Sequence, residues 1–113
     1  MKLLNNNIIT KLQSSISIIP IADISYIEKV KGTKYLHIVT INNMYKSKST
    51  LKKTIAILSN YGFVNVNRSI IVNTRNLVEI SAKSIPFLNF KGNIQIYISV
   101  NSAKKMIKYI KDC

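Results

Sequence analysis

The sequence predicts a mostly β protein, with short antiparallel strands in stacked sheets and two short helices. Short β-branched runs recur along all 113 residues, and Gly, Pro, Asn and Ser residues separate them. Apolar residues with a helical spacing occur in only two segments. We expect a single domain, residues 1–113, because a chain of this length can form one hydrophobic core of useful size.

Ten short strands account for most of the predicted order. They comprise residues 8–12, 16–19, 24–30, 35–41, 44–48, 63–66, 70–72, 77–81, 85–90 and 94–99. Residues 94–99 alternate polar and apolar side chains without a break, which is the period of a strand with one face in water. The strand at 35–41 carries bulky groups on both faces and is expected inside its sheet. Lysines in the strand at 44–48 indicate an edge strand.

The first predicted helix follows the edge strand. Leu51, Ile55 and Leu58 recur at a spacing that places them on one helical face, which would cover a sheet. Gly62 should end this segment. We expect no ligand role for this helix. The candidate N-terminal caps are Ser49 and Thr50.

The second predicted helix spans residues 100–111. Its apolar face comprises Val100, Ala103, Ile107 and Ile110. Its opposite, basic face comprises Lys104, Lys108 and Lys111. Cations late in a helix interact well with the helix dipole, so this face suits an ordinary solvated surface as well as it suits phosphate contact.

Residues 63–77 are the most informative stretch. Two strands flank a polar turn of Asn67, Arg68 and Ser69. Rigid flanks suit the reading of a partner's surface, because they reduce the entropy that the arginine loses when it docks. A solvated hairpin turn is the alternative interpretation of these residues alone.

The charge of the chain favours an anionic partner. There are 17 Lys and Arg residues against 4 Asp and Glu, a net charge of +13, and the pI is about 10.0. Such an imbalance creates a positive field that attracts polyanions. Nucleic acid is the commonest partner of this kind, and an anionic membrane surface is the next.

Catalysis and cofactor binding are not expected. Four scattered acids, one His and one Cys offer no paired carboxylates, no metal cluster and no catalytic triad. Phosphate-binding glycine motifs are absent among three glycines. One cysteine and no signal peptide indicate a cytoplasmic protein, and no apolar run reaches the length of a membrane span.

A pattern of residues extends over most of the chain, from about residue 8 to residue 110. In the central stretch it comprises Phe63, Asn65, Val66, Asn67, Arg68, Ser69, Ile70, Ile71, Val72, Asn73 and Leu77. Upstream it comprises Pro20, Asp23, Ile24, Tyr26, Ile27 and Glu28. This pattern resembles the LytTR DNA-binding domain of bacterial transcription and response regulators. Two positions depart from it, since Asn67 replaces the family's usual His and Asn101 stands where an arginine is common.

The resemblance implies a mostly β fold that binds double-stranded promoter DNA through inter-strand loops, entering successive major grooves at direct repeats. The base contacts that it implies are Lys34, Arg68 and Asn101. The backbone contacts or turn supports are Lys31, Asn67, Ser69, Lys104 and Lys105. Arg suits guanine, Asn suits adenine, and Lys suits guanine or phosphate.

The implied partners are a second copy on the direct repeat and a receiver domain, if this chain is the C-terminal part of a longer regulator. A stand-alone regulator is equally compatible with the sequence. Binding of RNA or single-stranded nucleic acid is the main alternative function, and it usually needs exposed aromatic platforms. A membrane-surface module is a weaker alternative, because the second helix has no Trp or Phe to anchor it.

Overall fold

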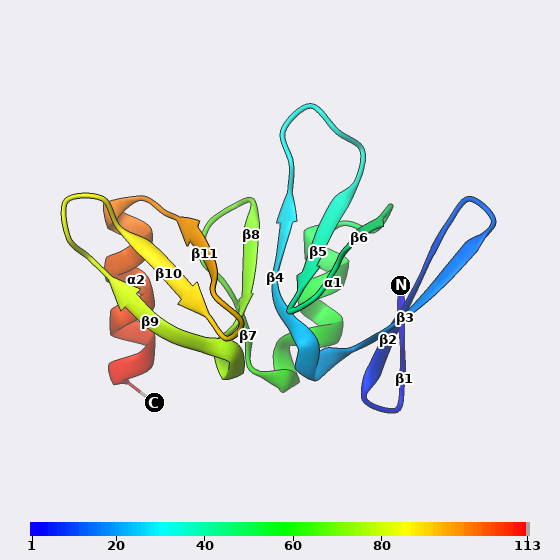
Figure 1. Ribbon diagram of the computed structural model, residues 1–113, viewed down its shortest axis with the longest axis horizontal. Coiled ribbons are helices and arrows are strands. Elements are labelled where there is room, and N and C mark those ends of the chain that lie inside the picture. The colour runs from blue at the N-terminus through cyan, green and yellow to red at the C-terminus, as the bar shows by residue number, and fades with distance from the viewer. Residues whose placement is uncertain (113) are drawn as a thin grey trace.

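A computed structural model describes residues 1–112, which form eleven strands and two α-helices (Figure 1). The strands are β1 Lys2–Leu4, β2 Asn7–Leu12, β3 Ser15–Pro20, β4 Ile24–Lys29, β5 Leu36–Thr40, β6 Met44–Ser47, β7 Phe63–Asn65, β8 Ile70–Asn73, β9 Leu77–Ser81, β10 Phe87–Phe90 and β11 Ile94–Tyr97. The helices are α1 Leu51–Leu58 and α2 Val100–Lys111, with 3-10 turns η1 Ile21–Asp23, η2 Ser59–Tyr61 and η3 Thr74–Asn76.

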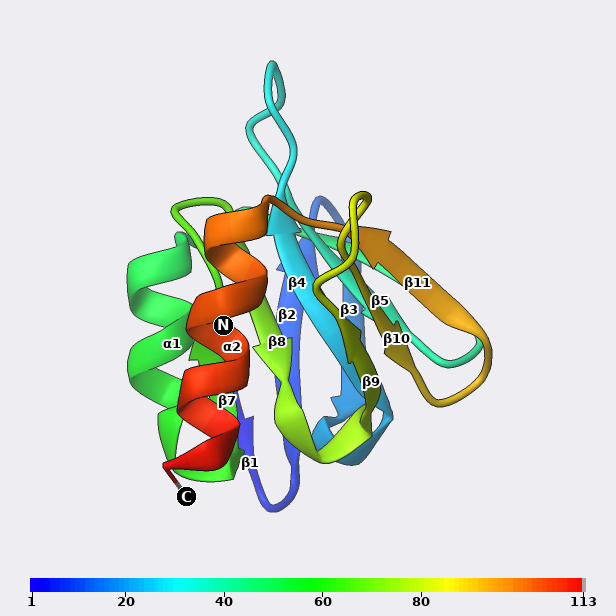
Figure 2. The ribbon, with the colours of Figure 1, turned by 90° about the vertical axis from the view of Figure 1, so that its left-hand side faces the viewer.

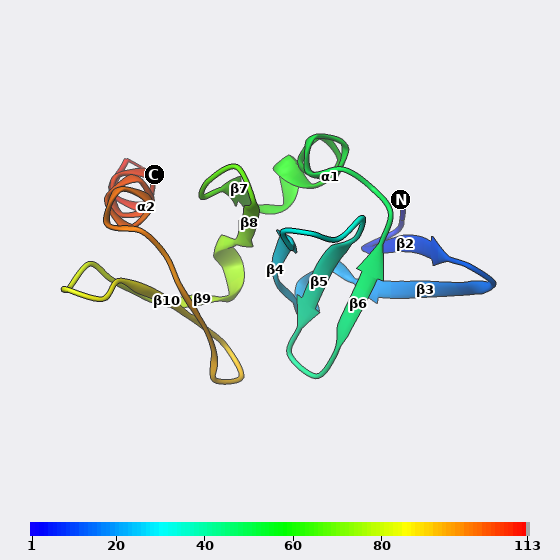
Figure 3. The same cartoon turned by 90° about the horizontal axis from the view of Figure 1, so that it is seen from above.

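The strands form three antiparallel sheets. The central sheet has five strands in the order β6-β5-β4-β8-β7, and three-stranded meanders, β1-β2-β3 and β11-β10-β9, accompany it. The predicted mostly β fold with antiparallel sheets and two helices is therefore confirmed. Strand β5 is interior and β6 is at an edge, as the sequence predicted. Both helices lie on the same side of the sheets when the molecule is viewed from above (Figure 3).

One strand was missed and two predicted strand boundaries were wrong by two residues, whereas the other boundaries agree to within one residue. Strand β1 was not predicted, although it pairs with β2 along its whole length. The strand predicted at 85–90 begins only at Phe87, because Pro86 has no N–H group to donate to the ladder. The strand predicted at 94–99 ends at Tyr97, because Ser99 caps α2 instead.

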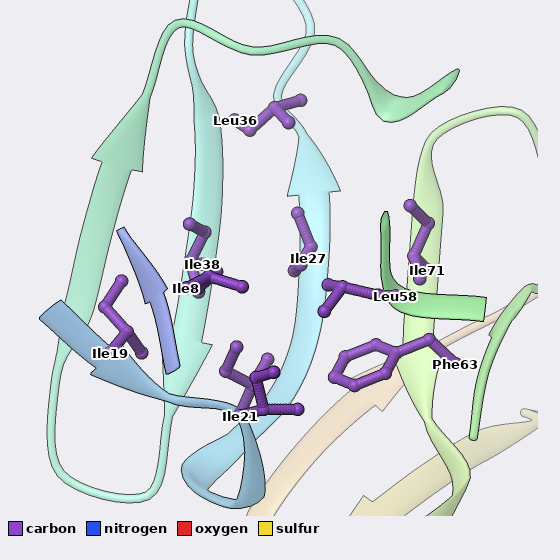
Figure 4. Packing of buried hydrophobic residues seen from close by; sticks show 10 residues of the cluster. Ile8, Ile19, Ile21, Ile27, Leu36, Ile38, Leu58, Phe63 and Ile71 are labelled. Carbon is purple, nitrogen blue, oxygen red and sulfur yellow. The ribbon is translucent and has the colours of Figure 1, made fainter. Parts of the chain in front are cut away.

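Two hydrophobic clusters lie on opposite faces of β4 and β8. The first core comprises Ile8, Ile19, Ile21, Ile24, Ile27, Leu36, Ile38, Leu58, Phe63 and Ile71 (Figure 4). The second core comprises Val66, Ile70, Val72, Leu88, Phe90 and Met106. Because successive side chains of a strand point to opposite faces, Ile71 enters the first core while Ile70 and Val72 enter the second. The β-branched run of the central stretch is therefore buried on both sides.

Helix α1 begins where the sequence indicated, and the helical segment that continues through η2 ends at Gly62, as predicted. Of the two candidate caps, Thr50 is the one used, and its Oγ1 accepts a hydrogen bond of 3.1 Å from the backbone N–H of Lys53. Gly62 follows η2 with a φ of 85°, which glycine adopts readily. Leu58 is fully buried, whereas Leu51 and Ile55 are only partly buried against the first core.

The predicted buried face of α2 was partly wrong. Ser102, Ala103 and Met106 are buried, whereas Val100 is 44% and Ile110 43% exposed. Because Ser102 and Met106 are buried together with Ala103, the buried face of the helix is rotated from the predicted one. The helix packs on β9 and closes the second core.

Candidate nucleic-acid interface

The turn between β7 and β8 holds Arg68 at its tip. The Oδ1 atom of Asn67 accepts a 2.7 Å hydrogen bond from the backbone N–H of Ser69, which closes a local Asx turn. The N–H of Val66 donates to the carbonyl of Ile70 at 3.0 Å, and both of these side chains are buried in the second core. Asn67, Arg68 and Ser69 are exposed. The turn is thus rigid at its base and open at its tip.

A further hydrogen bond ties this turn to β4. The backbone N–H of Lys29 donates to the carbonyl of Ser69 at 2.8 Å. Ser69 therefore supports the turn through both of its backbone groups, and its hydroxyl takes no part in these bonds.

Arg68 lies beside cations from both helices. An open hollow is lined by Arg68 and Asn67 of the turn, Lys52 of α1 and Lys105 of α2. The remaining lining residues are Asn65, Leu51 and Ile55, so the hollow contains three cations and no acidic group. The fold therefore brings together two of the sequence-predicted cations, Arg68 and Lys105.

Lys52 is a candidate that sequence reasoning missed, since α1 was assigned only a packing role. The available signal was its place in the first turn of a helix that follows an edge strand. Nothing in the sequence showed that this turn would face Arg68, because that depends on how α1 packs against β7 and β8.

Lys31 and Lys34 lie on a separate loop, between β4 and β5. Thr33 organises this loop, since its hydroxyl donates to the carbonyl of Val30 at 2.9 Å and its backbone N–H donates to the same oxygen at 3.2 Å. Gly32 has a φ of 83° there. Both lysines are exposed, and the loop projects beyond the rest of the molecule (Figure 2). Neither lysine lines the hollow beside Arg68.

The first turns of α2 carry Asn101, Lys104 and Lys105, and all three side chains are exposed. The Oγ atom of Ser99 caps the helix by accepting a 3.1 Å hydrogen bond from the N–H of Ser102. Of these three candidates only Lys105 lines the hollow, whereas Asn101 and Lys104 lie outside it.

These elements share one edge of the molecule. The β4–β5 loop, the β7–β8 turn and the N-terminal ends of both helices lie at the edge drawn uppermost in Figure 2. We call this the upper edge. Lys and Arg side chains only donate hydrogen bonds, so these cations can bind the oxygens of an anionic partner. The rigid Arg68 turn lies between the two helices, with the Lys31–Lys34 loop projecting beside it.

Metal-ligand groups, membrane-spanning helices and shifted pKa values also bear on what the upper edge can do. Residues 1–112 contain no group of three or more His, Cys, Asp or Glu side chains that could hold a metal ion. In the same part of the chain, neither helix is long and apolar enough to cross a membrane. Burial raises the pKa of Tyr26, which packs against Phe90 in the second core rather than at the upper edge.

Comparison with known proteins agrees with this architecture. A sequence model of the LytTr DNA-binding domain family matches residues 14–111. No curated protein matches the chain in sequence. A solved LytTr DNA-binding domain, from a protein described as a methyl-accepting/DNA response regulator of Bacillus cereus, is similar with a TM-score of 0.76 and 18% sequence identity. The similarity covers 94% of this chain and 97% of that chain, and at this identity it shows a shared fold.

The β-rich fold and the basic upper edge, which carries exposed Lys and Arg side chains on its loops and helix ends, are typical of a nucleic-acid-binding domain. The family match covers most of the sequence, and the chain belongs to the LytTr DNA-binding domain family. It is a DNA-binding domain, and the family is not a catalytic one.

Proposed function

We propose that this domain binds double-stranded promoter DNA in a sequence-dependent way, as part of a bacterial transcription regulator. In this proposal the β7–β8 turn enters a major groove and Arg68 reads a base, most favourably guanine. The guanidinium group can donate two parallel hydrogen bonds to O6 and N7 of guanine. Cations around the turn bind phosphates and set its orientation.

The observation that carries the proposal is the way in which the fold holds the backbone of Arg68. The side chain is exposed, but the backbone beneath it is fixed by the Asn67 bond, by the Lys29 bond and by the burial of Val66 and Ile70. Little entropy is then lost in ordering the turn when it docks. A turn with only a solubilising role has no need for such bracing.

The other proposed DNA contacts come from residues that share the upper edge with Arg68. Lys34, on the projecting loop, and Asn101, in the first turn of α2, would reach base edges on either side of Arg68. Lys31, Lys104 and Lys105 would contact phosphates, and Lys52 joins this group because it lies in the same hollow as Arg68. Asn67 would support the turn rather than read a base, since its Oδ1 already accepts the Ser69 hydrogen bond.

The arrangement on DNA is also part of the proposal. Two copies would occupy a direct repeat from one side and enter successive major grooves. The domain would follow a receiver domain in a response regulator whose phosphorylation controls binding. Analytical ultracentrifugation on one-repeat and two-repeat duplexes tests the first point, because two copies should bind only the two-repeat duplex.

The central experiment begins with selection of bound duplexes from a random pool. Arg68→Ala should then weaken binding to the selected site by about 1–3 kcal/mol and relax preference at one base pair. Its melting temperature should stay nearly unchanged, because the side chain is exposed. Arg68→Lys should recover part of the affinity and little of the preference, because lysine lacks the bidentate fork.

The matched control is Lys91→Ala, in the exposed β10–β11 turn at the opposite edge of the molecule (Figure 1). It should leave both affinity and preference almost unchanged. If Arg68→Ala weakens every duplex equally, Arg68 is a phosphate anchor and direct readout is wrong. If single strands displace the labelled duplex as well as unlabelled duplex does, the domain is a single-strand binder instead.

A further inference from the structure

A second hollow at the N-terminal end of α1 gathers three lysines from distant parts of the sequence. Its lining includes Lys11 of β2, Lys48 from the β6–α1 connection and Lys53 of α1. We call it the three-lysine cleft. Arg68 lies in the other hollow, which meets α1 at Leu51, Lys52 and Ile55, whereas the cleft meets α1 at Lys53, Ala56 and Ile57. The two hollows therefore lie on different faces of the same helix.

The cleft is built around a buried hydrogen bond. The Oγ1 atom of Thr10 donates to the Oγ atom of Ser47 at 2.7 Å, and both residues are buried. Lys11 and Lys48 are the next residues along the chain from this bonded pair. The bond thus holds β2 beside the end of β6 and brings both lysines to one cleft. Lys53 is fixed separately, since its N–H donates to the capping oxygen of Thr50.

The positive charges of the cleft are not balanced by any acidic residue in its lining. The four acidic residues of the chain are Asp23, Glu28, Glu79 and Asp112, and none of them lines the cleft. Three like charges around one hollow repel one another, so the arrangement favours a bound anion. The first turn of α1 adds a partial positive charge of its own. Compact ammonium groups suit phosphate oxygens as point charges, without discrimination between bases.

We propose that the three-lysine cleft holds the phosphate backbone of the DNA strand that borders the groove entered by Arg68. This inference rests on the proposed function. A helix with its side chains is roughly 10–12 Å across, and the major groove is roughly 12 Å wide. Helix α1 separates the cleft from the Arg68 hollow, because the two hollows lie on different faces of it. The width of this helix is comparable to that of the groove, so a duplex that receives Arg68 carries its bordering phosphates past α1 toward the lysines of the cleft.

The test compares two triple variants that remove the same charge. The cleft variant carries Lys11→Gln, Lys48→Gln and Lys53→Gln. The control variant carries Lys91→Gln, Lys108→Gln and Lys111→Gln, all exposed and located on the β10–β11 turn and the C-terminal end of α2, away from the upper edge (Figures 1 and 2). Affinity is measured on the selected duplex over a range of salt concentrations, with melting temperatures to confirm that both variants fold.

The cleft variant should bind more weakly to the selected site and to every single-base change of it by the same factor. Its plot of log affinity against log salt should become shallower by about one for each lysine that contacts phosphate, hence by about three. The control variant should show a much smaller change. Equal slopes for the two triple variants would overturn the inference, because the effect would then come from net charge alone.

Neutral methylphosphonate linkages, placed one at a time in the duplex, locate the contact. With the parent chain, a cluster of linkages beside the base read by Arg68 should weaken binding, and the cleft variant should be insensitive to that cluster. If every linkage that weakens binding of the parent chain also weakens binding of the cleft variant, the inference is wrong. If the parent chain shows no preference among duplexes, the proposed function fails as well, and this outcome is distinct from a failure of the cleft alone.

Discussion

The two helices begin at the same edge of the molecule, but they are held to it differently. Helix α1 inserts the fully buried Leu58 into the larger first core, and Leu51, Ile55 and Ile57 pack around it. Helix α2 contributes Met106 to the second core, which has six buried residues against ten in the first. Regions with less buried apolar contact open more easily. The α1 half is therefore the firmer support, and α2 carries Asn101 and Lys104 on the more easily deformed half.

The largest expected effect is on stability, from the loss of the Leu58 side chain that holds α1 in the first core. Leu58→Ala should lower the free energy of unfolding by about 2–5 kcal/mol, because it leaves a cavity in a closed core. Met106→Ala should cost less, because fewer buried side chains surround this position in the smaller second core. Urea unfolding of both variants measures the difference. The comparison of the two halves is wrong if Met106→Ala costs more than Leu58→Ala.

A matched variant in the same helix sharpens this prediction. The earlier expectation treated Ile55 as a core residue equal to Leu58, whereas the structure places it only partly inside. Ile55→Ala should therefore destabilise the domain less than Leu58→Ala does. Ile55 also lines the hollow beside Arg68, so the affinity of the Ile55→Ala variant for the duplex should be measured in the same series.

A smaller effect concerns the turn that joins the two halves. Asn67→Ala removes the acceptor of the Ser69 hydrogen bond and should cost about 0.5–1.5 kcal/mol of stability. Asn67→Asp keeps an acceptor oxygen at this position, so the melting temperature should be largely retained. Its added negative charge beside Arg68 should nevertheless weaken duplex binding. If Asn67→Asp binds as tightly as the parent chain, Asn67 does not face the DNA.

The smallest effect is a pH dependence in the second core. Burial, and to a lesser extent the charge of Glu28, raises the pKa of Tyr26 above its usual 10.0. The folded state then holds the phenol proton more tightly than the unfolded chain does. This contribution to stability is full below pH 10.0 and is lost as the pH rises through the raised pKa.

Tyr26→Phe should therefore flatten the alkaline decline in the free energy of unfolding above about pH 10. The control is Tyr97→Phe, since Tyr97 is 69% exposed. Urea unfolding at several pH values provides the measurement. Equal flattening in both variants would show that burial of Tyr26 is not the cause.

Local patterns predicted most of the strands and the start of α1. The alternation that begins at Ile94 and the cap at Thr50 depend on neighbours in the sequence, so they were visible there. The buried face of α2 was not visible in the sequence, because it depends on how Ser102 and Ala103 pack against the rest of the fold. Strand β1 is short and lacks alternation, and it exists because β2 offers a free edge.

The candidate site was predictable only in part, for the same reason. The Asx turn that holds Arg68 could be predicted, because Asn67 and Ser69 adjoin Arg68 in the chain, whereas the hydrogen bond from Lys29 of β4 could not. Lys52 and the three-lysine cleft could not, because they depend on where α1 lies and on the hydrogen bond between Thr10 and Ser47. Sequence spacing gives no information about a contact between a strand near the start of the chain and an edge strand far beyond it.

The hydrogen bond from Lys29 to Ser69 has a consequence for how the Arg68 turn could be transplanted. A synthetic peptide of residues 63–77 would contain the Asx bond of Asn67, but it would lack β4 and the backbone N–H of Lys29 that donates to the carbonyl of Ser69. The pairing of β4 with β8 would also be missing. Grafting this segment onto an unrelated hairpin would thus transfer the amino acids without the shape. A miniaturised DNA reader based on this domain has to retain β4 together with the turn.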